Sequence, residues 1–411
     1  MKPYIAFAIL LSAFQLFSFS AFGQGSLTPP GPPAPTMKKL DEVEPRTNLQ
    51  ATPAPAGVDT SNADYHFIIN QPGSYYLSAN IVVTKANGIQ INAEGVTLDL
   101  NGFQISQVSP SGNGIEMPNT SHRTTVRNGT VKGFVSGIVG GAKACVFRDL
   151  AVTGCTTYGI ITGPGAVLES CRAHDNSGIA AIAAGQGSTV SNCVANGNTT
   201  TYGISVNYNS AVTNCSAFSN TGLYGIHAYA GSTLTNCSAA FNIGTGTGSG
   251  GIYAGAGATV THCSAYYNNS TGVSSPSTGM GFILNSGSTI QNCTAYLNFG
   301  DGIRVSSDCV VRENISGANN IFVAAGIHST GSSNRIEGNN VMTNSVGINV
   351  DVAGNVIVKN TARQNTTNYH IGANNVFGAI VDRTAAVSAV VSGNSAPSSA
   401  GTTDPWANIS Y

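Results

Sequence analysis

Apolar and polar residues alternate over short stretches of this chain, and the stretches return at a regular interval. In one interval Ile226 and Ala228 alternate with polar neighbours, Leu234 follows, and Cys237 and Ala239 alternate again. Alternation with a period of two is the pattern of a β-strand with one buried face. Each interval therefore predicts three short strands whose apolar side chains point to a common interior.

The interval is marked by a repeated phrase, apolar-x-x-Cys-x-Ala, with an asparagine five residues after each cysteine. The cysteines are Cys171, Cys193, Cys215, Cys237, Cys263 and Cys293, and the asparagines are Asn176, Asn198, Asn220, Asn242, Asn268 and Asn298. The first four cysteines are each 22 residues apart. A repeat of this length, made of short strands broken by Gly and Asn, predicts a β-solenoid. A glycine followed by an apolar residue opens most turns from Gly88 to Gly347, which gives about twelve turns.

The three-strand coil with this phrase resembles the right-handed parallel β-helix of the pectate-lyase-like superfamily, over Gly88 to Val381. The resemblance implies an all-β fold, a single-stranded right-handed parallel β-helix of about twelve three-strand coils. The opening Gln71–Leu77 and the ending Asp404–Asn408 are also similar to exported bacterial β-helix repeat proteins of unassigned role. The likeness is specific for the fold and weak for activity.

The cysteine and asparagine columns are expected to be structural. Cysteines at one position of successive turns stack as an inward column, close enough for disulfides, which exported proteins often contain. Each cysteine nevertheless has equivalent neighbours above and below, and Asn314, Asn339 and Asn360 replace it in the last three turns. Buried free thiols are therefore favoured, with disulfides left open. The asparagines are expected to form an amide ladder along the axis.

Composition indicates an exported protein without a nucleic-acid partner. Lys2 and the apolar stretch Ile5–Phe19 are typical of a cleaved signal peptide, and no other segment is expected to span a membrane. The predicted organisation is a signal peptide (1–23), a Pro-rich linker (24–57), an N-terminal cap (58–87), the β-helix (88–384) and a C-terminal tail or cap (385–411). Export would place the chain in the medium, the periplasm or at the cell surface. The formal net charge of −1 excludes capture of nucleic acid by bulk charge.

Function in a solenoid is expected where the repeat is interrupted. The long insertions, Phe241–Gly250 and Tyr266–Met280, leave the same corner and should flank the outer face of the first strand. Adding two to each glycine number predicts the outward column of that face: Gln90, Glu116, Val139, Ile161, Ala180, Ser205, His227, Tyr253, Ile283, Arg304, His328 and Asn349. This column is apolar or small in early turns and becomes polar, ionisable and aromatic from His227 onward.

In related β-helices this face forms a polysaccharide cleft, so the resemblance implies a groove here. Its candidate catalytic residues are Arg304, as base or charge neutraliser, with His328, and Asp301 and Asp351 for acid chemistry or a cation. The candidate substrate-binding residues are His227, Tyr229, Tyr253 and Asn285. The alternative is that all of these are ordinary solvated side chains.

Signatures of known enzymes are missing. The polygalacturonase-type pairs Asp-Asp and Gly-His-Gly do not occur, and Arg335-Ile336 is followed by Glu337. No metal site and no cofactor are expected, apart from calcium if the protein is a lyase. Three hypotheses remain: a non-catalytic protein that binds extracellular polysaccharide, a polysaccharide lyase acting on uronic-acid polymers, and a structural or adhesive surface protein. The oligomeric state is left open.

Overall fold

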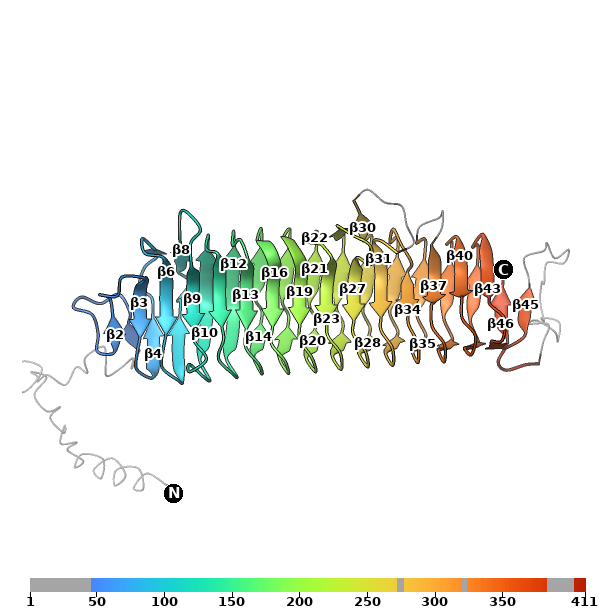
Figure 1. The fold of residues 1–411 in the computed structure, drawn as a ribbon, viewed down its shortest axis with the longest axis horizontal. Helices are drawn as coiled ribbons and strands as arrows, with labels where there is room; N and C mark the ends of the chain where they lie inside the picture. Colours follow the sequence, from blue (N-terminus) through green and yellow to red (C-terminus); the bar gives the residue numbers. More distant parts are fainter. Residues whose placement is uncertain (1–45, 272–276, 320–323, 383–402) are drawn as a thin grey trace, which may run out of the picture. The chain divides into compact units, whose positions relative to one another are not determined.

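The computed structural model describes residues 46–271, 277–319, 324–382 and 403–411. Within these residues every regular element is a β-strand. The chain winds through three short strands per turn and stacks each turn on the one before in parallel register (Figure 1). The predicted all-β parallel solenoid is therefore confirmed.

The first strands of successive turns form one parallel sheet, which we call the first-strand sheet. Its members are β3 (Tyr65–Ile69), β6 (Asn87–Ile91), β9 (Asn113–Met117), β11 (Ser136–Gly140), β13 (Tyr158–Thr162), β16 (Ser177–Ala184), β19 (Thr199–Val206), β23 (Tyr224–Ala228), β27 (Gly250–Ala254), β31 (Met280–Leu284), β34 (Ile303–Val305), β37 (Ala325–Ser329), β40 (Val346–Val350) and β43 (Thr367–Ile371).

The second strands form the next face of the coil. They are β4 (Gly73–Tyr76), β7 (Val96–Asp99), β14 (Val167–Glu169), β17 (Thr189–Ser191), β20 (Ala211–Thr213), β24 (Thr233–Thr235), β28 (Thr259–Thr261), β32 (Thr289–Gln291), β35 (Val310–Arg312), β38 (Arg335–Glu337), β41 (Val356–Val358) and β44 (Val376–Phe377). In two turns the second and third strands are continuous, as β10 (Thr125–Lys132) and β12 (Val146–Thr153).

The third strands complete each turn. They are β5 (Ile81–Val82), β8 (Gln104–Ser106), β15 (Arg172–His174), β18 (Val194–Asn196), β21 (Ser216–Phe218), β25 (Ser238–Ala240), β29 (Ser264–Tyr266), β33 (Thr294–Tyr296), β36 (Ile315–Gly317), β39 (Asn340–Met342), β42 (Thr361–Arg363) and β46 (Asn408–Ser410). Short accessory strands are β1 (Thr47–Asn48), β2 (Val58–Asp59), β22 (Thr221–Gly222), β26 (Ile243–Gly244), β30 (Asn269–Ser270) and β45 (Ile380–Asp382).

The solenoid has about 14 turns rather than the predicted twelve. The sequence count relied on glycine at the start of each turn, but the turns at both ends lack it. Phe67 of β3 pairs with Ile89, which puts His66 at the glycine position, and Tyr369 of β43 pairs with Ile348, which puts Asn368 there. A stacked turn therefore does not require the glycine, which is why the count fell short.

One turn was also aligned wrongly. Ala180 was predicted in the outward column, but it pairs with Tyr158 and Tyr202, and Ala183 is the residue level with Ile161 and Ser205. Gly178, with a φ of 99°, lies near the start of β16 and pairs with Thr200, whereas Ala181 is the residue level with Gly203. The short interval after Cys171 caused this shift of three residues.

The interior follows the predicted alternation. Ile226, Ala228, Leu234 and Ala239 are buried. The corner between the second and third strands is left-handed, as at Asn236 with a φ of 53°. Asparagine tolerates this conformation better than most residues, which explains its recurrence there. The expected tight corners are therefore confirmed.

The second asparagine column forms a continuous hydrogen-bonded ladder. From Asn176 to Asn298 each Nδ2 donates to the Oδ1 of the next asparagine at 2.8–3.0 Å, and the same Oδ1 also accepts the backbone N–H of the preceding asparagine. The ladder continues through Asn319, Asn344 and Asn365. These amides satisfy buried backbone groups that the turn leaves without a strand partner.

The hydrogen bonds along the cysteine column show why asparagine can replace cysteine in the last turns. All nine cysteines are buried and free. The backbone N–H of Cys263 donates to the Sγ of Cys293 at 3.3 Å, and the backbone N–H of Cys293 donates to the Oδ1 of Asn314 at 2.9 Å. The cysteine Sγ and the asparagine Oδ1 thus accept the equivalent hydrogen bond from the backbone N–H of the preceding turn. From Asn314 the column becomes a second ladder that reaches Asn408 of β46 at the C-terminal end.

The predicted signal peptide (1–23) and most of the linker (24–57) lie outside the described residues, as does much of the tail (385–411). The boundaries of the cap (58–87) and of the β-helix (88–384) stay predictions. Within the described residues, no helix is long and apolar enough to cross a membrane.

Substitution of Asn220 by Ala should destabilise the solenoid by about 3 kcal/mol, because it leaves buried donors and acceptors in two adjacent turns unpaired. Asn220 donates to Asn242 and to the Ala195 carbonyl, and it accepts two bonds from Asn198. Thermal unfolding measures the effect. The matched control is Asn196→Ala on the exposed side of β18, and equal unfolding temperatures for the two variants would contradict the ladder's importance.

Thiol titration should find all nine cysteines after unfolding without reductant and almost none in the folded protein. Burial raises the pKa of Cys145, Cys155 and Cys309, which keeps these thiols protonated and unreactive. Fewer than half of the thiols reacting after denaturation would instead indicate disulfides.

Candidate functional site

The outward side chains of the first-strand sheet form one column along the solenoid axis. The strand register aligns Ser205, His227, Tyr253, Ile283, Arg304, His328, Asn349 and His370 in successive turns from β19 to β43. Neighbouring members are about 4.8 Å apart along the axis, the usual strand spacing. The candidate residues therefore share one surface, with the aromatic ones in the middle turns and the ionisable ones in the later turns.

The aromatic cluster consists of Tyr202, Tyr224, His227, Tyr229 and Tyr253. His227 lies at its centre, with its ring 4.6 Å from Tyr202 and 4.9 Å from Tyr253 between centroids, both nearly parallel. Tyr224 stacks on Tyr253 at 4.8 Å, and Tyr229 meets the His227 ring edge-on at 4.6 Å. Stacked and edge-to-face contacts of this kind hold rings in fixed orientations.

His227 is covered by its neighbours rather than presented to solvent. Only 6% of the residue is exposed, and burial lowers its pKa to about 4. Tyr229 is 38% exposed and Tyr253 is partly buried, with its hydroxyl accepting a hydrogen bond from Asn285 Nδ2 at 2.7 Å. Of the four predicted substrate-binding residues, Tyr229, Tyr253 and Asn285 thus reach the surface, and His227 supports the rings from beneath.

The four predicted catalytic residues come together. His328 Nδ1 lies 2.7 Å from Asp301 Oδ2, and its Nε2 lies 2.8 Å from Asp351 Oδ2. Arg304 Nη1 lies 3.9 Å from Asp301 Oδ2 and donates to Ser277 Oγ at 2.6 Å. Ser277 belongs to the long insertion before β31, so this insertion contacts the predicted face.

His328 is held between two carboxylates, and this sets its charge. Burial opposes protonation, but the hydrogen bonds and negative charges of Asp301 and then Asp351 outweigh burial, so the pKa of His328 is raised. A protonated ring donates from both nitrogens, one to each carboxylate. The arrangement therefore favours an imidazolium and leaves neither nitrogen free to accept a proton.

The polar network extends beyond the predicted residues. Asn349 Nδ2 donates to Asp351 Oδ1 at 3.0 Å, and Asn349 Oδ1 pairs with His370 Nδ1 at 2.7 Å. His370 was missed because its turn lacks the glycine from which the column was counted. Tyr202 and Tyr224 were missed because they stand one residue before that glycine. The recurring phrase Tyr-Gly-Ile at Tyr158, Tyr202 and Tyr224 was the available signal.

The oxygens of both carboxylates are engaged by other protein groups. Asp301 Oδ1 accepts the Ala325 N–H, Asp351 Oδ1 accepts from Asn349, and the remaining oxygen of each acid contacts His328. All four oxygens are thus engaged, whereas calcium requires six to eight oxygen ligands. Among the described residues, no group of three or more His, Cys, Asp or Glu side chains is arranged to hold a metal ion.

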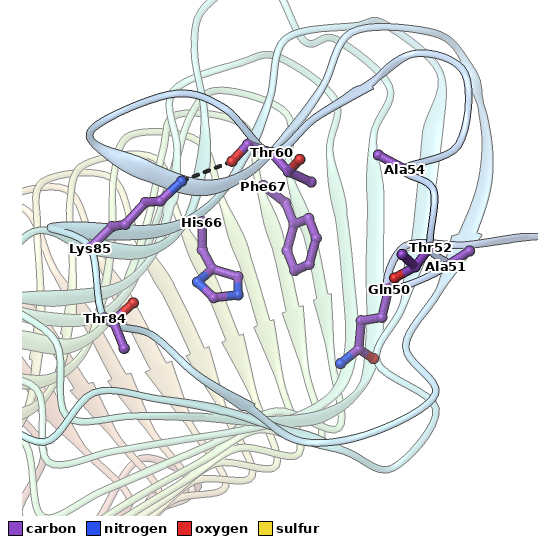
Figure 2. A pocket seen from close by; sticks show the side chains of 9 residues that line it. All are labelled: Gln50, Ala51, Thr52, Ala54, Thr60, His66, Phe67, Thr84 and Lys85. Atoms are coloured by element: carbon purple, nitrogen blue, oxygen red, sulfur yellow. Dashed lines mark hydrogen bonds between the residues drawn. The ribbon is translucent and has the colours of Figure 1, made fainter.

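A separate pocket lies in the first turns, away from the predicted residues (Figure 2). Gln50, His66, Phe67 and Lys85 help to line it, and Lys85 Nζ donates to the carbonyls of Thr60 and Asn62. Within the described part of the chain, His66 Nδ1 is buried without a hydrogen-bond partner. None of the predicted site residues lines this pocket.

Comparison with known proteins agrees with the architecture. Residues 202–367 match the family described as right handed beta helix region. The match agrees with the right-handed parallel β-helix fold that the sequence predicted. No curated protein is significantly similar to it.

Three solved structures illustrate the similarity. The A-module of mannuronan C-5 epimerase AlgE4 from Azotobacter vinelandii is 18% identical, covering 75% of this chain and 91% of that chain, with a TM-score of 0.49. The periplasmic alginate epimerase AlgG is 12% identical, covering 80% and 81%, with a TM-score of 0.33. Pectate lyase Pel9A is 17% identical, covering 74% and 64%, with a TM-score of 0.25. These names describe the reactions of those proteins, and the identities are too low to extend them to this chain.

Lowering the pH from about 6.5 to about 4 should destabilise the wild type more than the variant His227→Phe. The folded-state pKa of His227 is about 4, below its ordinary value of 6.5, so the unfolded chain takes up the proton first. The stabilisation is complete above pH 6.5 and is lost as the pH falls, by up to about 3 kcal/mol. Unfolding temperatures at pH 7 and pH 4.5 measure it. Parallel pH profiles of the two proteins would refute the burial of His227.

Proposed function

We propose that the chain is an exported protein that binds extracellular or cell-surface polysaccharide, without cleaving it, through the outer face of the first-strand sheet. The observation that carries the proposal is the aromatic cluster, in which buried His227 supports exposed Tyr229 and partly buried Tyr253. Rings already fixed by their neighbours lose little conformational entropy on binding. Their apolar faces can pack against the C–H surfaces of sugar rings while the phenol groups meet hydroxyls.

Arg304 supplies a cation further along the same column. It stands two turns from Tyr253, about 10 Å at the usual strand spacing, and its side chain is 29% exposed. A guanidinium can pair with a carboxylate in two parallel hydrogen bonds. A polysaccharide lying along the axis would therefore meet aromatic rings first and then a positive group, which supports binding of a polymer that carries acidic sugars.

A lyase acting on uronic-acid polymers is the second candidate, favoured by the convergence of Asp301, Arg304, His328 and Asp351. The geometry gives it less support, because a lyase needs a group that removes a proton. Both ring nitrogens of His328 are engaged by Asp301 and Asp351, which raise its pKa, and an arginine side chain stays charged in proteins. The network is better suited to fixing Arg304 and the surface around it than to proton abstraction.

Binding to a panel of uronic-acid polymers should be measurable without formation of unsaturated products, followed by ultraviolet absorbance. Tyr229→Ala and Tyr253→Ala should each weaken binding at least about fivefold, since an aromatic contact contributes about 1 kcal/mol beyond its buried area. Phe377→Ala is the matched control, because Phe377 is an exposed aromatic residue on β44.

The outcomes separate the three hypotheses. Product formation that Arg304→Ala abolishes would replace the binding proposal with the lyase. Binding that Phe377→Ala weakens as much as Tyr253→Ala would refute the proposed surface. Neither binding nor product would leave a structural or adhesive role.

A further inference from the structure

A second aromatic surface lies on a different face of the solenoid, outside the third strands. It consists of Phe218, Phe241, Tyr266, Tyr267 and Tyr296, each between 36% and 46% exposed, and we call it the aromatic ridge. Phe218, Tyr266 and Tyr296 are the last residues of β21, β29 and β33, which share one register column. Phe241 and Tyr267 occupy the corners that follow β25 and β29.

The ridge is continuous. Phe241 lies 5.3 Å from Phe218, 5.4 Å from Tyr266 and 5.3 Å from Tyr267 between ring centroids. Tyr296 continues the row beside Tyr266 at 6.4 Å, with the two planes 7° apart. The column from Phe218 to Tyr296 crosses three turn spacings, roughly 14 Å. Contiguous exposed apolar surface of this kind indicates a binding partner.

Two members of the ridge occupy backbone positions that are unfavourable for bulky residues. Phe241 has a φ of 55° and Tyr267 a φ of 49°. The equivalent corner two turns before Phe241 is held by Gly197, with a φ of 63°. The left-handed conformation belongs to this corner in neighbouring turns too, as at Ser219 with a φ of 53° and Leu297 with a φ of 55°. Glycine adopts this conformation without the steric cost that a bulky side chain carries, so it can replace Phe241 or Tyr267 without disturbing the corner.

The lack of charged residues around the ridge indicates what kind of partner it can bind. From Asn176 to Gly300 the sequence contains no Asp, Glu, Lys or Arg. The ridge therefore offers no ion pair to an acidic polymer, and no cations to the anionic headgroups that attract proteins to membranes. The ridge is also only two side chains wide, whereas a stable protein interface buries about 800 Å² on each partner. These properties suit a narrow, uncharged ligand with apolar faces.

We propose that the aromatic ridge is a second binding surface, specific for uncharged polysaccharide. The pyranose C–H faces pack on Phe218, Phe241 and Tyr266, and the phenol groups of Tyr267 and Tyr296 exchange hydrogen bonds with sugar hydroxyls. The ridge lies on the third strands and the corners that follow them, and the candidate groove lies on the first-strand sheet, so the two surfaces use different side chains. A chain with both would hold two polymers at once and gain avidity on a mixed matrix.

Co-sedimentation of the purified protein with cellulose, chitin and starch tests the proposal. The wild type should bind at least one of these polymers, with an affinity that changes less than twofold between low salt and about 0.5 M NaCl, because no charge is involved. The variants Phe241→Gly and Tyr267→Gly should lower the affinity about tenfold while keeping or raising the unfolding temperature, since glycine suits the left-handed corner. If the ridge had only a structural role, these variants would change stability and would not lose binding while the fold stays stable.

Further outcomes would overturn it. Absence of binding to all three polymers, or binding that salt abolishes, would refute an uncharged ligand. A molecular mass by light scattering that falls to that of a monomer in Phe241→Gly would assign the ridge to a second copy of the chain, and sedimentation with neutral or anionic lipid vesicles would assign it to membranes. Tyr229→Ala should leave binding to these polymers unchanged, and Phe241→Gly should leave binding to uronic-acid polymers unchanged, so failure of one surface is distinguishable from failure of the other.

Discussion

The buried peptide groups at the corners of each turn must all form hydrogen bonds, and the rest of the structure depends on this constraint. Strand ladders pair the backbone along the faces of the coil, but the corners leave N–H and C=O groups inside the molecule. Asn198 and its equivalents solve this with an amide that donates to the asparagine of the next turn and accepts from the asparagine of the preceding turn, as a peptide unit does. Since each amide needs its neighbour at the same depth, the ladder holds successive turns in register.

The parallel register of the coils also determines the candidate groove and the aromatic ridge. An outward side chain in one turn lies about 4.8 Å from its counterpart in the next, so substitutions at equivalent positions build rows without any change in the backbone. Tyr253 and Arg304 belong to one such row, and Phe218 and Tyr266 to another. Insertions leave through one corner, so Ser277 can approach Arg304 while the buried columns stay continuous.

Sequence alone was sufficient for the coil because its repeat obeys local rules: alternation, left-handed corners and evenly spaced asparagines. The sequence did not predict features that depend on contacts between side chains of different turns. His227 occupies the predicted outward position, yet rings from two neighbouring turns cover it, and Tyr202 and Tyr224 were outside the pattern that was counted. The convergence of His328 with Asp301 and Asp351 depends on side-chain conformations across three turns, which spacing does not specify. The insertions that begin at Phe241 and Tyr266 were expected to flank the first strand, and spacing alone did not indicate that these rings pack together outside the third strands.

The interchange of sulfur and amide oxygen at Cys293 and Asn314 has a consequence for how such a molecule changes in length. Because equivalent atoms recur in every turn, excising one complete repeat, such as residues 193–214, would rejoin chain ends that meet identical surroundings. Removing part of a repeat would leave the hydrogen-bond donors and acceptors of adjacent turns out of register. The buried columns can therefore be shortened or extended only by a whole coil at a time, and each outward row of side chains would change in length by the same step.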